Sequence, residues 1–449
     1  MAKTNMTEQD TATLYLRHLG EKMTRFQSIL SKTGFSELLI GSGQVKTQFQ
    51  DDLFYPFKAN PYFKEWVPLN RRENCYLHIK IDDIRPRLLL LDAEDIWHTA
   101  PQVLPHDFER GLDIMDYTSS NDVLKLTGSD PSTTAFIGET NSLHLPVECC
   151  NPQILLNHID FQRRHKTDYE QFCVREANRL AIPPHKAAYQ AFKDGASELE
   201  ISAAYLSACD CSENHMPYPI IAGINEHAAV LHHSNLSSHA PQQRHSFLID
   251  AGVDFHGYAS DITRTYAYDP DSEFAEMVQI MDIKQQELVA TGAIGAKPVE
   301  IHRLAHRKVA ETLCQFGILK ISPDEALETG LTEHFFPHGV GHHLGINVHD
   351  KGTKLANPQG EVIPPPDAYP KLRQTTPMVA NQIYTVEPGL YFIPLLLKKL
   401  SRGQTAAKLD WSRVKNFLPY GGIRIEDNIV LHEDGSLENL TRNAFRQVA

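Results

Sequence analysis

Two aspartates flank a predicted β-hairpin near the middle of the chain. Residues 246–266 contain two β-rich runs around Asp254-Phe-His-Gly257, a pattern typical of a tight turn with Asp first and Gly fourth. A turn centred on Phe255 and His256 would make Asp250 and Asp261 direct cross-strand neighbours, with Cβ atoms roughly 5 Å apart. Two carboxylates about 4 Å apart repel by roughly 4 kcal/mol near a protein surface. A shared proton or a bound cation would explain the pair, whereas solvated strand ends or a bulge would separate it.

A glycine-rich segment farther along the chain carries several imidazoles. It runs from His338 to Asp350 and includes His342 and His349. Its glycines disfavour a helix, so a helical zinc pair formed by His338 and His342 is not expected. A loop of this kind lets the backbone approach a ligand while imidazoles project from it. Histidines can also decorate a loop without function, and the segment alone leaves both interpretations open.

Two later predicted strands carry glutamates where a folded chain would bury them. Glu387 follows the apolar run 384–386 and precedes Pro388-Gly389, which is expected to end the strand. A buried glutamate is rare unless it is paired or coordinated. The strand predicted over 421–430 alternates Ile423, Ile425 and Ile429 with Arg424, Glu426 and Asn428. Its polar face is either a site or the solvated side of an edge strand.

These segments together supply four carboxylates and one imidazole: Asp250, Asp261, His342, Glu387 and Glu426. Four negative charges balance two divalent cations. Oxygen-rich coordination with a single nitrogen suits Mn²⁺ or Mg²⁺ better than a structural zinc. Two metal ions about 3.5–4 Å apart can activate water at neutral pH and polarise a carbonyl or phosphoryl oxygen. The set therefore predicts a hydrolase.

With these five residues in this order, residues 166–449 resemble the metallopeptidases of the pita-bread fold, which include methionine aminopeptidase, aminopeptidase P and prolidase. The segments 338–350, 387–389 and 421–426, and the N-terminal residues 51–57, are most similar to bacterial Xaa-Pro dipeptidases. That group includes enzymes called organophosphorus acid anhydrolases. The resemblance implies a pita-bread catalytic domain over 166–449 that follows a small α/β domain over 1–165.

The resemblance also implies roles for the metal ligands. Asp261 and Glu426 would bridge two metal ions, most plausibly Mn²⁺, while Asp250 holds one ion and His342 and Glu387 hold the other. A bridging hydroxide would attack the scissile carbonyl, and Glu387 would act as the general base.

Further residues match the family's substrate-binding positions. His232, His338 and His349 would bind substrate or stabilise the tetrahedral intermediate, whereas His227 and His233 are expected to be bystanders. Arg424 suits the carboxylate of a C-terminal proline, because a guanidinium binds carboxylates in a bidentate way. Tyr218 and Asp51 match a small substrate pocket. Asp51 lies in an aromatic-rich loop that is either a surface loop or a lid or dimer loop that reaches a binding site, with Asp51 acting across a homodimer in the latter case.

The resulting hypothesis is a metal-dependent dipeptidase that cleaves Xaa-Pro, with organophosphorus esters or fluorides as candidate side substrates. One alternative is an aminopeptidase P that acts on longer Xaa-Pro peptides. The other is a protein-binding module without catalysis, which the presence of all five ligands disfavours.

Composition sets the broader expectations. The 449 residues carry a formal charge of −13, with 41% hydrophobic and 22% charged residues, as in a globular protein. No Lys/Arg stripe suggests nucleic acid, and no apolar run approaches the roughly 20 residues of a membrane span. The polar N-terminus lacks the pattern of a signal peptide. Seven cysteines without framework spacing predict reduced thiols and a cytoplasmic location.

Hydrophobic periodicity predicts a mixed α/β (α+β) fold. In the N-terminal part it predicts a helix over 7–32 and strands over 37–40, 75–81, 87–91 and 134–137. In the C-terminal part it predicts helices over 273–288 and 299–316. A helix from residue 168 is expected to be interrupted at Pro183-Pro184 and to resume over 186–192, because proline lacks the donor that a continuous helix needs.

Overall fold

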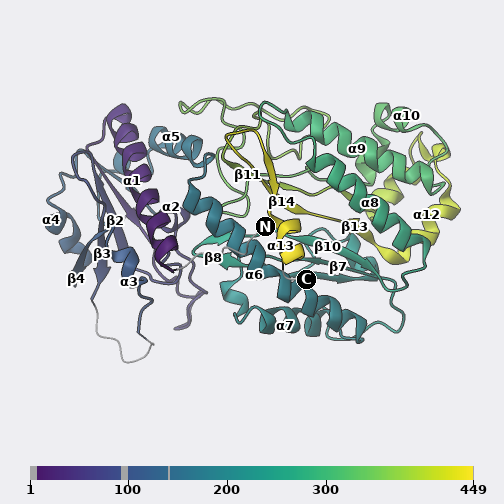
Figure 1. Ribbon diagram of the computed structural model, residues 1–449, viewed down its shortest axis with the longest axis horizontal. Helices are drawn as coiled ribbons and strands as arrows, with labels where there is room; N and C mark the ends of the chain where they lie inside the picture. Colours follow the sequence, from purple (N-terminus) through teal and green to yellow (C-terminus); the bar gives the residue numbers. More distant parts are fainter. Residues whose placement is uncertain (1–7, 93–99, 140–141, 448–449) are drawn as a thin grey trace. The chain divides into compact units, whose positions relative to one another are not determined.

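The computed structural model describes residues 8–92, 100–139 and 142–447. The chain forms two compact units. The first comprises Met1–Cys173 with the short segments Phe255–Tyr258 and Leu355–Val362, and the second comprises the remaining residues. Each unit contains both helices and strands (Figure 1), which confirms the predicted mixed α/β class.

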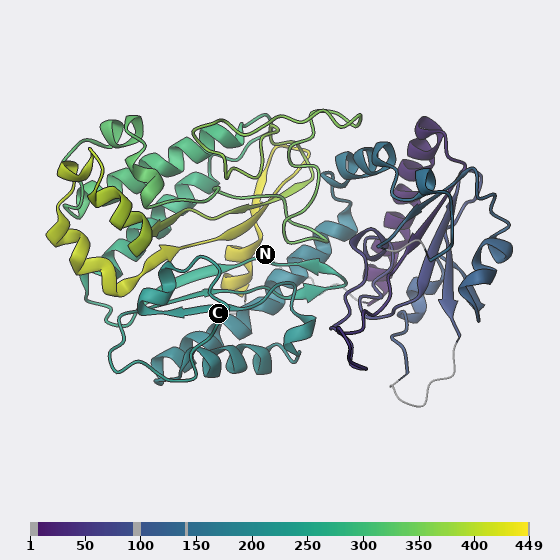
Figure 2. The ribbon, with the colours of Figure 1, turned by 180° about the vertical axis from the view of Figure 1, so that it is seen from behind.

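The first unit is built on a five-stranded sheet with the order β4-β3-β2-β1-β5, which Figure 2 shows from its other side. β1 is antiparallel to β2 and parallel to β5, and β3 is parallel to β4. Helix α1 packs against α5 and β2. The elements are α1 (Glu8–Thr33), β1 (Glu37–Gly41), α2 (Pro61–Lys64), β2 (Cys75–Lys80), β3 (Arg87–Leu91), α3 (His106–Glu109), β4 (Asp113–Tyr117), α4 (Val123–Thr127), β5 (Thr134–Ile137) and α5 (Gln153–Arg163).

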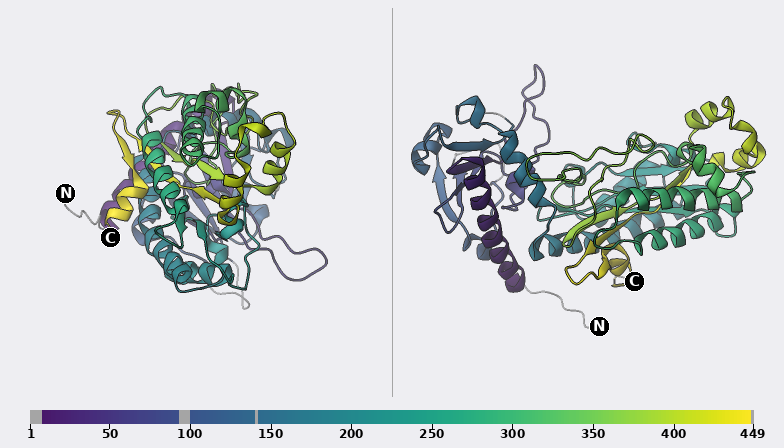
Figure 3. Two further views of the ribbon diagram at one scale, coloured as in Figure 1. Left: turned by 90° about the vertical axis from the view of Figure 1, so that its right-hand side faces the viewer. Right: turned by 90° about the horizontal axis from the view of Figure 1, so that it is seen from above.

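The second unit is built from short sheets. One sheet has the order β10-β7-β6, another the order β11-β14-β15, and β12 pairs with β13. Helices α8 and α9 run side by side (Figure 3). The elements from the α6 helix onward are α6 (Asp168–Lys193), α7 (Glu198–Ala208), β6 (Ile221–Ile224), β7 (Ser246–Asp250), β8 (Asp254–Phe255), β9 (Tyr258–Ala259), β10 (Thr263–Ala267), α8 (Glu273–Val289), α9 (Pro298–Gln315), α10 (Pro323–Glu328), β11 (Gln382–Val386), β12 (Gly389–Tyr391), α11 (Pro394–Ser401), α12 (Trp411–Phe417), β13 (Gly422–Arg424), β14 (Asp427–Leu431), β15 (Leu437–Asn439) and α13 (Leu440–Gln447).

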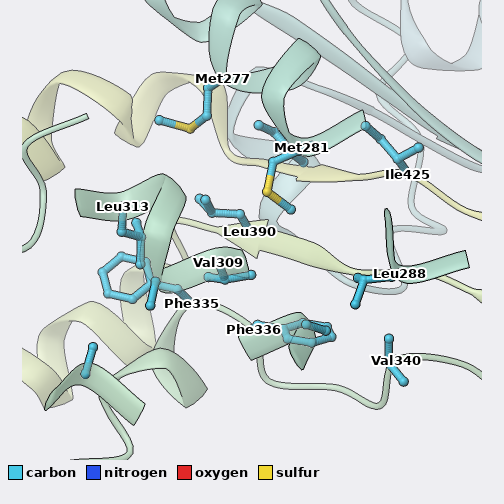
Figure 4. Packing of buried hydrophobic residues seen from close by; sticks show 14 of the residues in the cluster. Met277, Met281, Leu288, Val309, Leu313, Phe335, Phe336, Val340, Leu390 and Ile425 are labelled. Atoms are coloured by element: carbon cyan, nitrogen blue, oxygen red, sulfur yellow. The ribbon is translucent and has the colours of Figure 1, made fainter. Parts of the chain in front are cut away.

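Two apolar cores fix these sheets in place. One forms between α6–α7 and β6–β7, around Phe192, Tyr205 and Phe247. The other joins α8 and α9 to β11–β14, and Figure 4 shows side chains such as Met281 and Leu390 packed within it. Buried apolar surface of this extent is the main favourable term in folding. The sheets that carry the polar residues discussed below are therefore held rigidly.

Helix α6 runs without a break through Pro183 and Pro184, so the predicted interruption was wrong. Each internal proline costs a helix about 3 kcal/mol or more. Ala181 and Ile182, directly before the prolines, are fully buried, and so is Ala188 after them. The packing of this helix face outweighs the lost backbone hydrogen bonds.

Within the described residues, none of the helices is both long and apolar enough to span a membrane.

Candidate metal centre

The hairpin that carries the two aspartates has a different register from the predicted one. β7 and β10 pair antiparallel with Asp250 opposite Thr263, rather than opposite Asp261. The turn lies at His256 and Gly257, which have φ angles of 51° and 92°. A two-residue hairpin turn of type I′ needs positive φ at both central positions. The glycine therefore sits inside the turn rather than at its fourth position, and the predicted direct pairing was wrong.

The two carboxylates meet in spite of this shift. The hydroxyl of Tyr218 lies 2.9 Å from Oδ1 of Asp250 and 2.6 Å from Oδ1 of Asp261. One hydroxyl proton is thus shared between two acids. Burial and then the charge of Asp250 raise the pKa of Asp261 well above its usual range. The protein alone leaves this pair of acids short of countercharge.

The strand pattern at 421–430 is confirmed, although the strand divides into β13 and β14. Ile423, Ile425 and Ile429 lie in the apolar core of Figure 4. Arg424, Glu426 and Asn428 are also buried, with exposures of 4%, 2% and 0%. A solvated edge face is therefore excluded. The strand breaks at Glu426, whose N–H donates to the carbonyl of Thr263 at 3.1 Å and so brings the acid to the hairpin.

The glycine-rich loop is laid against β11. Thr385 N–H donates to the carbonyl of His342 at 2.9 Å, and Glu387 N–H donates to that of Val340 at 2.8 Å. A Cβ added at Gly341 would lie 2.0 Å from the carbonyl oxygen of Thr385, so only glycine allows this approach. The loop and the strand end therefore hold His342 and Glu387 next to each other.

His342 faces the acids with an unprotonated nitrogen. Its Nδ1–H donates to the carbonyl of His343 at 2.9 Å, which leaves the lone pair on Nε2. Burial lowers the pKa of His342 to about 4, so the ring is neutral at pH 7. Nε2 lies 3.5 Å from Oδ2 of Asp261 and 3.6 Å from Oε1 of Glu387. This is how a metal-binding histidine is held, with the other nitrogen fixed by a carbonyl.

The residues present fit a pair of divalent ions. Asp261, His342 and Glu426 offer ligand atoms within 4.8 Å of one another. The separations of 3.5 and 3.6 Å around His342 are too long for hydrogen bonds and suit two ligands of one ion. Burial and mutual repulsion raise the pKa values of Glu387 and Glu426 well above their usual range. A cation would relieve this repulsion.

Arg424 is bound to one of the expected metal ligands. Its guanidinium donates to Oδ2 of Asp250 at 2.7 Å, to the hydroxyl of Tyr391 at 2.9 Å and to Oγ1 of Thr263 at 3.2 Å. The side chain lines the same cavity as the acids, and three of its five N–H groups donate to the protein. The predicted contact with a substrate carboxylate stays a prediction.

The three expected catalytic histidines, His232, His338 and His349, line a cavity of about 510 Å³ together with the five expected ligands. Nδ1 of His338 donates to the carbonyl of Gly339, and its Nε2 lies 2.8 Å from the hydroxyl of Tyr391. Burial and then Arg424 lower the pKa of His338 to about 3. The ring of His349 lies edge-on to that of His342, with centroids 4.5 Å apart.

Three basic residues in the cavity wall were missed by the sequence analysis: Lys354, Lys371 and Arg373. All three belong to the segment 351–377, which has almost no regular structure. Among the residues that the structure describes, no carboxylate lies within ion-pair distance of them. Strand periodicity and ligand spacing give no signal in such a segment, so its basic residues could not be assigned to the cavity from the sequence.

Asp51 lies in the first unit, in an exposed loop. Its Oδ1 accepts hydrogen bonds from the backbone N–H groups of Asp52 at 2.7 Å and Leu53 at 3.2 Å, which close a tight turn. It is not among the described residues that line the cavity, whereas Tyr218 reaches the site through its contacts with the two aspartates.

A second cluster of ligand-type residues is formed by Glu198, His227 and His233. Here Nδ1 of His227 and Nε2 of His233 each lie 2.8 Å from an oxygen of Glu198, which is hydrogen-bond distance. The backbone N–H groups of Ile224 and Ser237 also donate to this carboxylate, both at 2.9 Å. Its acceptor positions are filled, so we interpret the cluster as an anchor for the loop that carries His232. His227 and His233 were expected to be bystanders; we interpret them as anchors of this loop.

Comparison with known proteins agrees with this geometry. The profile of metallopeptidase family M24 matches residues 173–433, and that of the Xaa-Pro dipeptidase N-terminal domain matches residues 13–161. The Xaa-Pro dipeptidase of Pseudoalteromonas translucida (strain TAC 125) is 43% identical over 435 residues, covering 96% of this chain and 98% of the relative. That of Shewanella woodyi (strain ATCC 51908 / MS32) is 41% identical, covering 95% and 97%.

The fold is also that of a solved structure. Zinc-substituted aminopeptidase P of E. coli, in complex with product, superposes with a TM-score of 0.68 at 22% identity and 95% coverage of both chains. At this identity the likeness concerns the fold alone. The profile matches and the close relatives over nearly the whole length place the chain in metallopeptidase family M24, among the Xaa-Pro dipeptidases.

Proposed function

We propose that this protein hydrolyses Xaa-Pro dipeptides with two divalent metal ions and that these ions are Mn²⁺. The observation that carries the proposal is the neutral His342, which faces Asp261 and Glu387 at ligand distance in the wall of a 510 Å³ cavity. The relatives named Xaa-Pro dipeptidases supply the substrate class. The oxygen-rich ligand set supports Mn²⁺.

Different residues of the chain would bind the ions and transfer the proton. Asp250, Asp261, His342, Glu387 and Glu426 would hold the ions, which supply Lewis acidity and lower the pKa of water. Glu387 would accept the proton of the attacking water and pass it to the leaving proline nitrogen. Its raised pKa in this structure supports a carboxyl that can carry a proton.

The histidines would act by hydrogen bonding. Tyr391 accepts from Arg424 and can donate to Nε2 of His338, whose Nδ1–H donates to Gly339. This chain of bonds would fix His338 beside the substrate. His232 and His349 also line the cavity and could stabilise the oxyanion of the tetrahedral intermediate as neutral donors.

Two guanidinium groups are candidates for the carboxylate of the C-terminal proline. Arg424 would be released from Asp250 when ions neutralise that acid. Arg373 lines the cavity and has no ionic partner among the described residues. Recognition of this carboxylate by either group would favour a dipeptide over a longer peptide. Hydrolysis of organophosphorus esters at the same centre is a secondary candidate.

We further propose a homodimer in which Asp51 reaches the partner's site. The loop around Asp51 exposes Phe49 by 88%, Leu53 by 60% and Tyr55 by 55%, which supports contact with a second copy of the chain. Sedimentation of the purified protein tests whether it is a dimer. The seven free cysteines support a cytoplasmic location.

The decisive experiment compares wild type with Glu387→Gln, both loaded with Mn²⁺, on Ala-Pro and Ala-Pro-Ala. We expect wild type to cleave Ala-Pro in preference to the tripeptide. Glu387→Gln should stay folded but lose turnover by about 10²–10⁴-fold, since it lacks the proton acceptor. Glu276→Gln, which neutralises an exposed acid on α8, is the matched control.

Full activity of Glu387→Gln would contradict the proposed base. Preference for Ala-Pro-Ala would instead indicate an aminopeptidase P. Metal analysis of each protein separates loss of chemistry from loss of the ions.

A further inference from the structure

The cavity carries more positive charge than a neutral dipeptide requires. If two divalent ions balance the four carboxylates, the charges of Arg424, Lys354, Lys371 and Arg373 remain in the wall. One cation can pair with the substrate carboxylate and another with the ionised water. The two lysines are then left without an anion among the described residues.

The fold fixes the backbone from which Lys371 and Arg373 project, while their side chains are exposed. Leu372 is 1% exposed and anchors the segment between Lys371 and Arg373. The backbone of Lys371 also packs on Gly339, where an added Cβ would lie 3.1 Å from the Lys371 carbonyl oxygen. Because Gly339 follows His338 directly, the backbone of Lys371 and Arg373 lies beside the glycine-rich loop that carries His338.

Lys354 is held at the other end of the same segment. Its carbonyl accepts a hydrogen bond from the N–H of Ile363 at 2.9 Å, and its side chain is half-buried in the cavity wall. The field of these cations is local, because the chain as a whole carries 56 acidic and 43 basic residues. A cavity lined by charge of one sign concentrates ligands of the opposite sign.

We propose that Lys354 and Lys371 select dipeptides with an acidic first residue, Asp-Pro and Glu-Pro. This inference rests on the proposed dipeptidase function. The proline carboxylate is common to all Xaa-Pro substrates, so any difference in negative charge between them comes from the first side chain. The same field disfavours Lys-Pro and Arg-Pro.

The test measures kcat/KM for the matched pair Glu-Pro and Gln-Pro, which differ in charge but hardly in shape. At low ionic strength we expect wild type to favour Glu-Pro by about tenfold, since partly exposed ion pairs contribute modestly. The ratio should shrink as salt screens the lysines. In the double variant Lys354→Met/Lys371→Met the ratio should fall towards one, mainly through KM for Glu-Pro.

The control is the double variant Lys398→Met/Lys399→Met, which removes the same charge from exposed positions on α11. It should keep the wild-type ratio. A wild-type ratio of one or less, or a preference that survives removal of both cavity lysines, would overturn the inference while leaving cleavage of Gln-Pro intact. Failure to cleave any dipeptide would remove the proposed function, and with it this inference.

Discussion

Asn428 fixes an expected metal ligand without itself being one. Its Oδ1 accepts the backbone N–H of Asp261 at 3.0 Å, and its Nδ2 donates to the Asp261 carbonyl at 2.5 Å. Asn428 is fully buried, so water cannot replace these bonds. The amide therefore determines where the Asp261 backbone, and with it the carboxylate, lies.

Replacing Asn428 should loosen the metal centre. In Asn428→Ala the Asp261 backbone loses both partners, and we expect the affinity for Mn²⁺ to fall by about 10–100-fold. Isothermal titration calorimetry of the metal-free protein measures this change. Asn157→Ala, which removes an amide that donates to Gln359 from α5, is the control and should bind Mn²⁺ like wild type. Unchanged affinity in folded Asn428→Ala would show that Asp261 needs no such support.

At the level of single residues, the sequence identified which side chains line the site but not all the hydrogen bonds and ion pairs that they form. The carboxylates and His342 were recognisable because each type is unusual in its buried setting. The ion pair of Arg424 with Asp250 was not, because it joins β13 to β7 across 174 positions. Lys354 and Lys371 were missed because their place depends on how an irregular segment folds.

At the level of elements, the hairpin shows why local patterns mislead about register. Asp254 and Gly257 suggested a turn centred one residue too early. The positive φ angles of His256 and Gly257 set the actual turn, and a shift of one residue in its centre moved the pairing partner of Asp250 by two positions. Sequence patterns rarely predict positive φ for a histidine.

This turn also predicts a pH effect. His256 Nδ1 lies 2.9 Å from the Tyr169 hydroxyl, and burial lowers its pKa from 6.5 to about 4. Between these values the unfolded chain binds a proton that the folded chain does not. The stability that the neutral ring contributes is thus complete above pH 6.5 and is lost as the pH falls towards 4.

His256→Asn should reduce this dependence, because Asn tolerates positive φ and does not titrate. Stability of wild type should fall more steeply than that of the variant between pH 6.5 and 4, by up to about 1.4 kcal/mol per pH unit. Melting temperatures at fixed Mn²⁺ concentration measure the difference. Parallel curves for the two proteins would mean that His256 does not titrate in this window.

Other elements were predicted to the extent that their apolar patterns were regular. The helix and four strands of the first unit agree with α1, β1, β2, β3 and β5 within a few residues at each end. β4 was missed because Asp113-Ile-Met-Asp-Tyr117 is an edge strand with mostly exposed or half-buried side chains. An edge strand of this kind lacks the apolar run that marks a buried one.

At the level of the whole molecule, the expected ions and the fold support each other. The second unit buries three acids, Asp250, Asp261 and Glu426, near the partly buried Glu387. Within the described residues, the only ion pair that a Lys or Arg forms with these four acids joins Arg424 to Asp250. Burying charge without a partner is costly. Ion binding should therefore add substantially to stability.

Removing the ions should lower the melting temperature. Dialysis against a chelator should destabilise the protein, and Mn²⁺ at 100 times its Kd should restore about 2.7 kcal/mol. Differential scanning calorimetry over a range of Mn²⁺ concentrations measures this. Asp261→Asn should lose most of the increase, whereas Asp434→Asn, an exposed acid, should keep it. An increase that persists in Asp261→Asn would place the stabilising ion elsewhere.

The broad architecture was accessible from the sequence, because periodicity predicted the mixed α/β class and the resemblance of residues 166–449 to the pita-bread metallopeptidases implied the catalytic fold. The boundary expected between residues 165 and 166 stays a prediction. The segments Phe255–Tyr258 and Leu355–Val362, which belong to the first unit, could not be foreseen because their contacts are distant in sequence.

Helix α13 has a consequence for how the metal centre can be lost. Thr441 in this helix accepts the N–H of Asn428 and donates to Oδ1 of Asn178, at 2.9 and 2.7 Å. The residue that holds the Asp261 backbone is thus itself held by α13. Local unfolding that detaches α13 would release Asn428, and the Asp261 backbone would lose its support without any change at the metal ligands themselves.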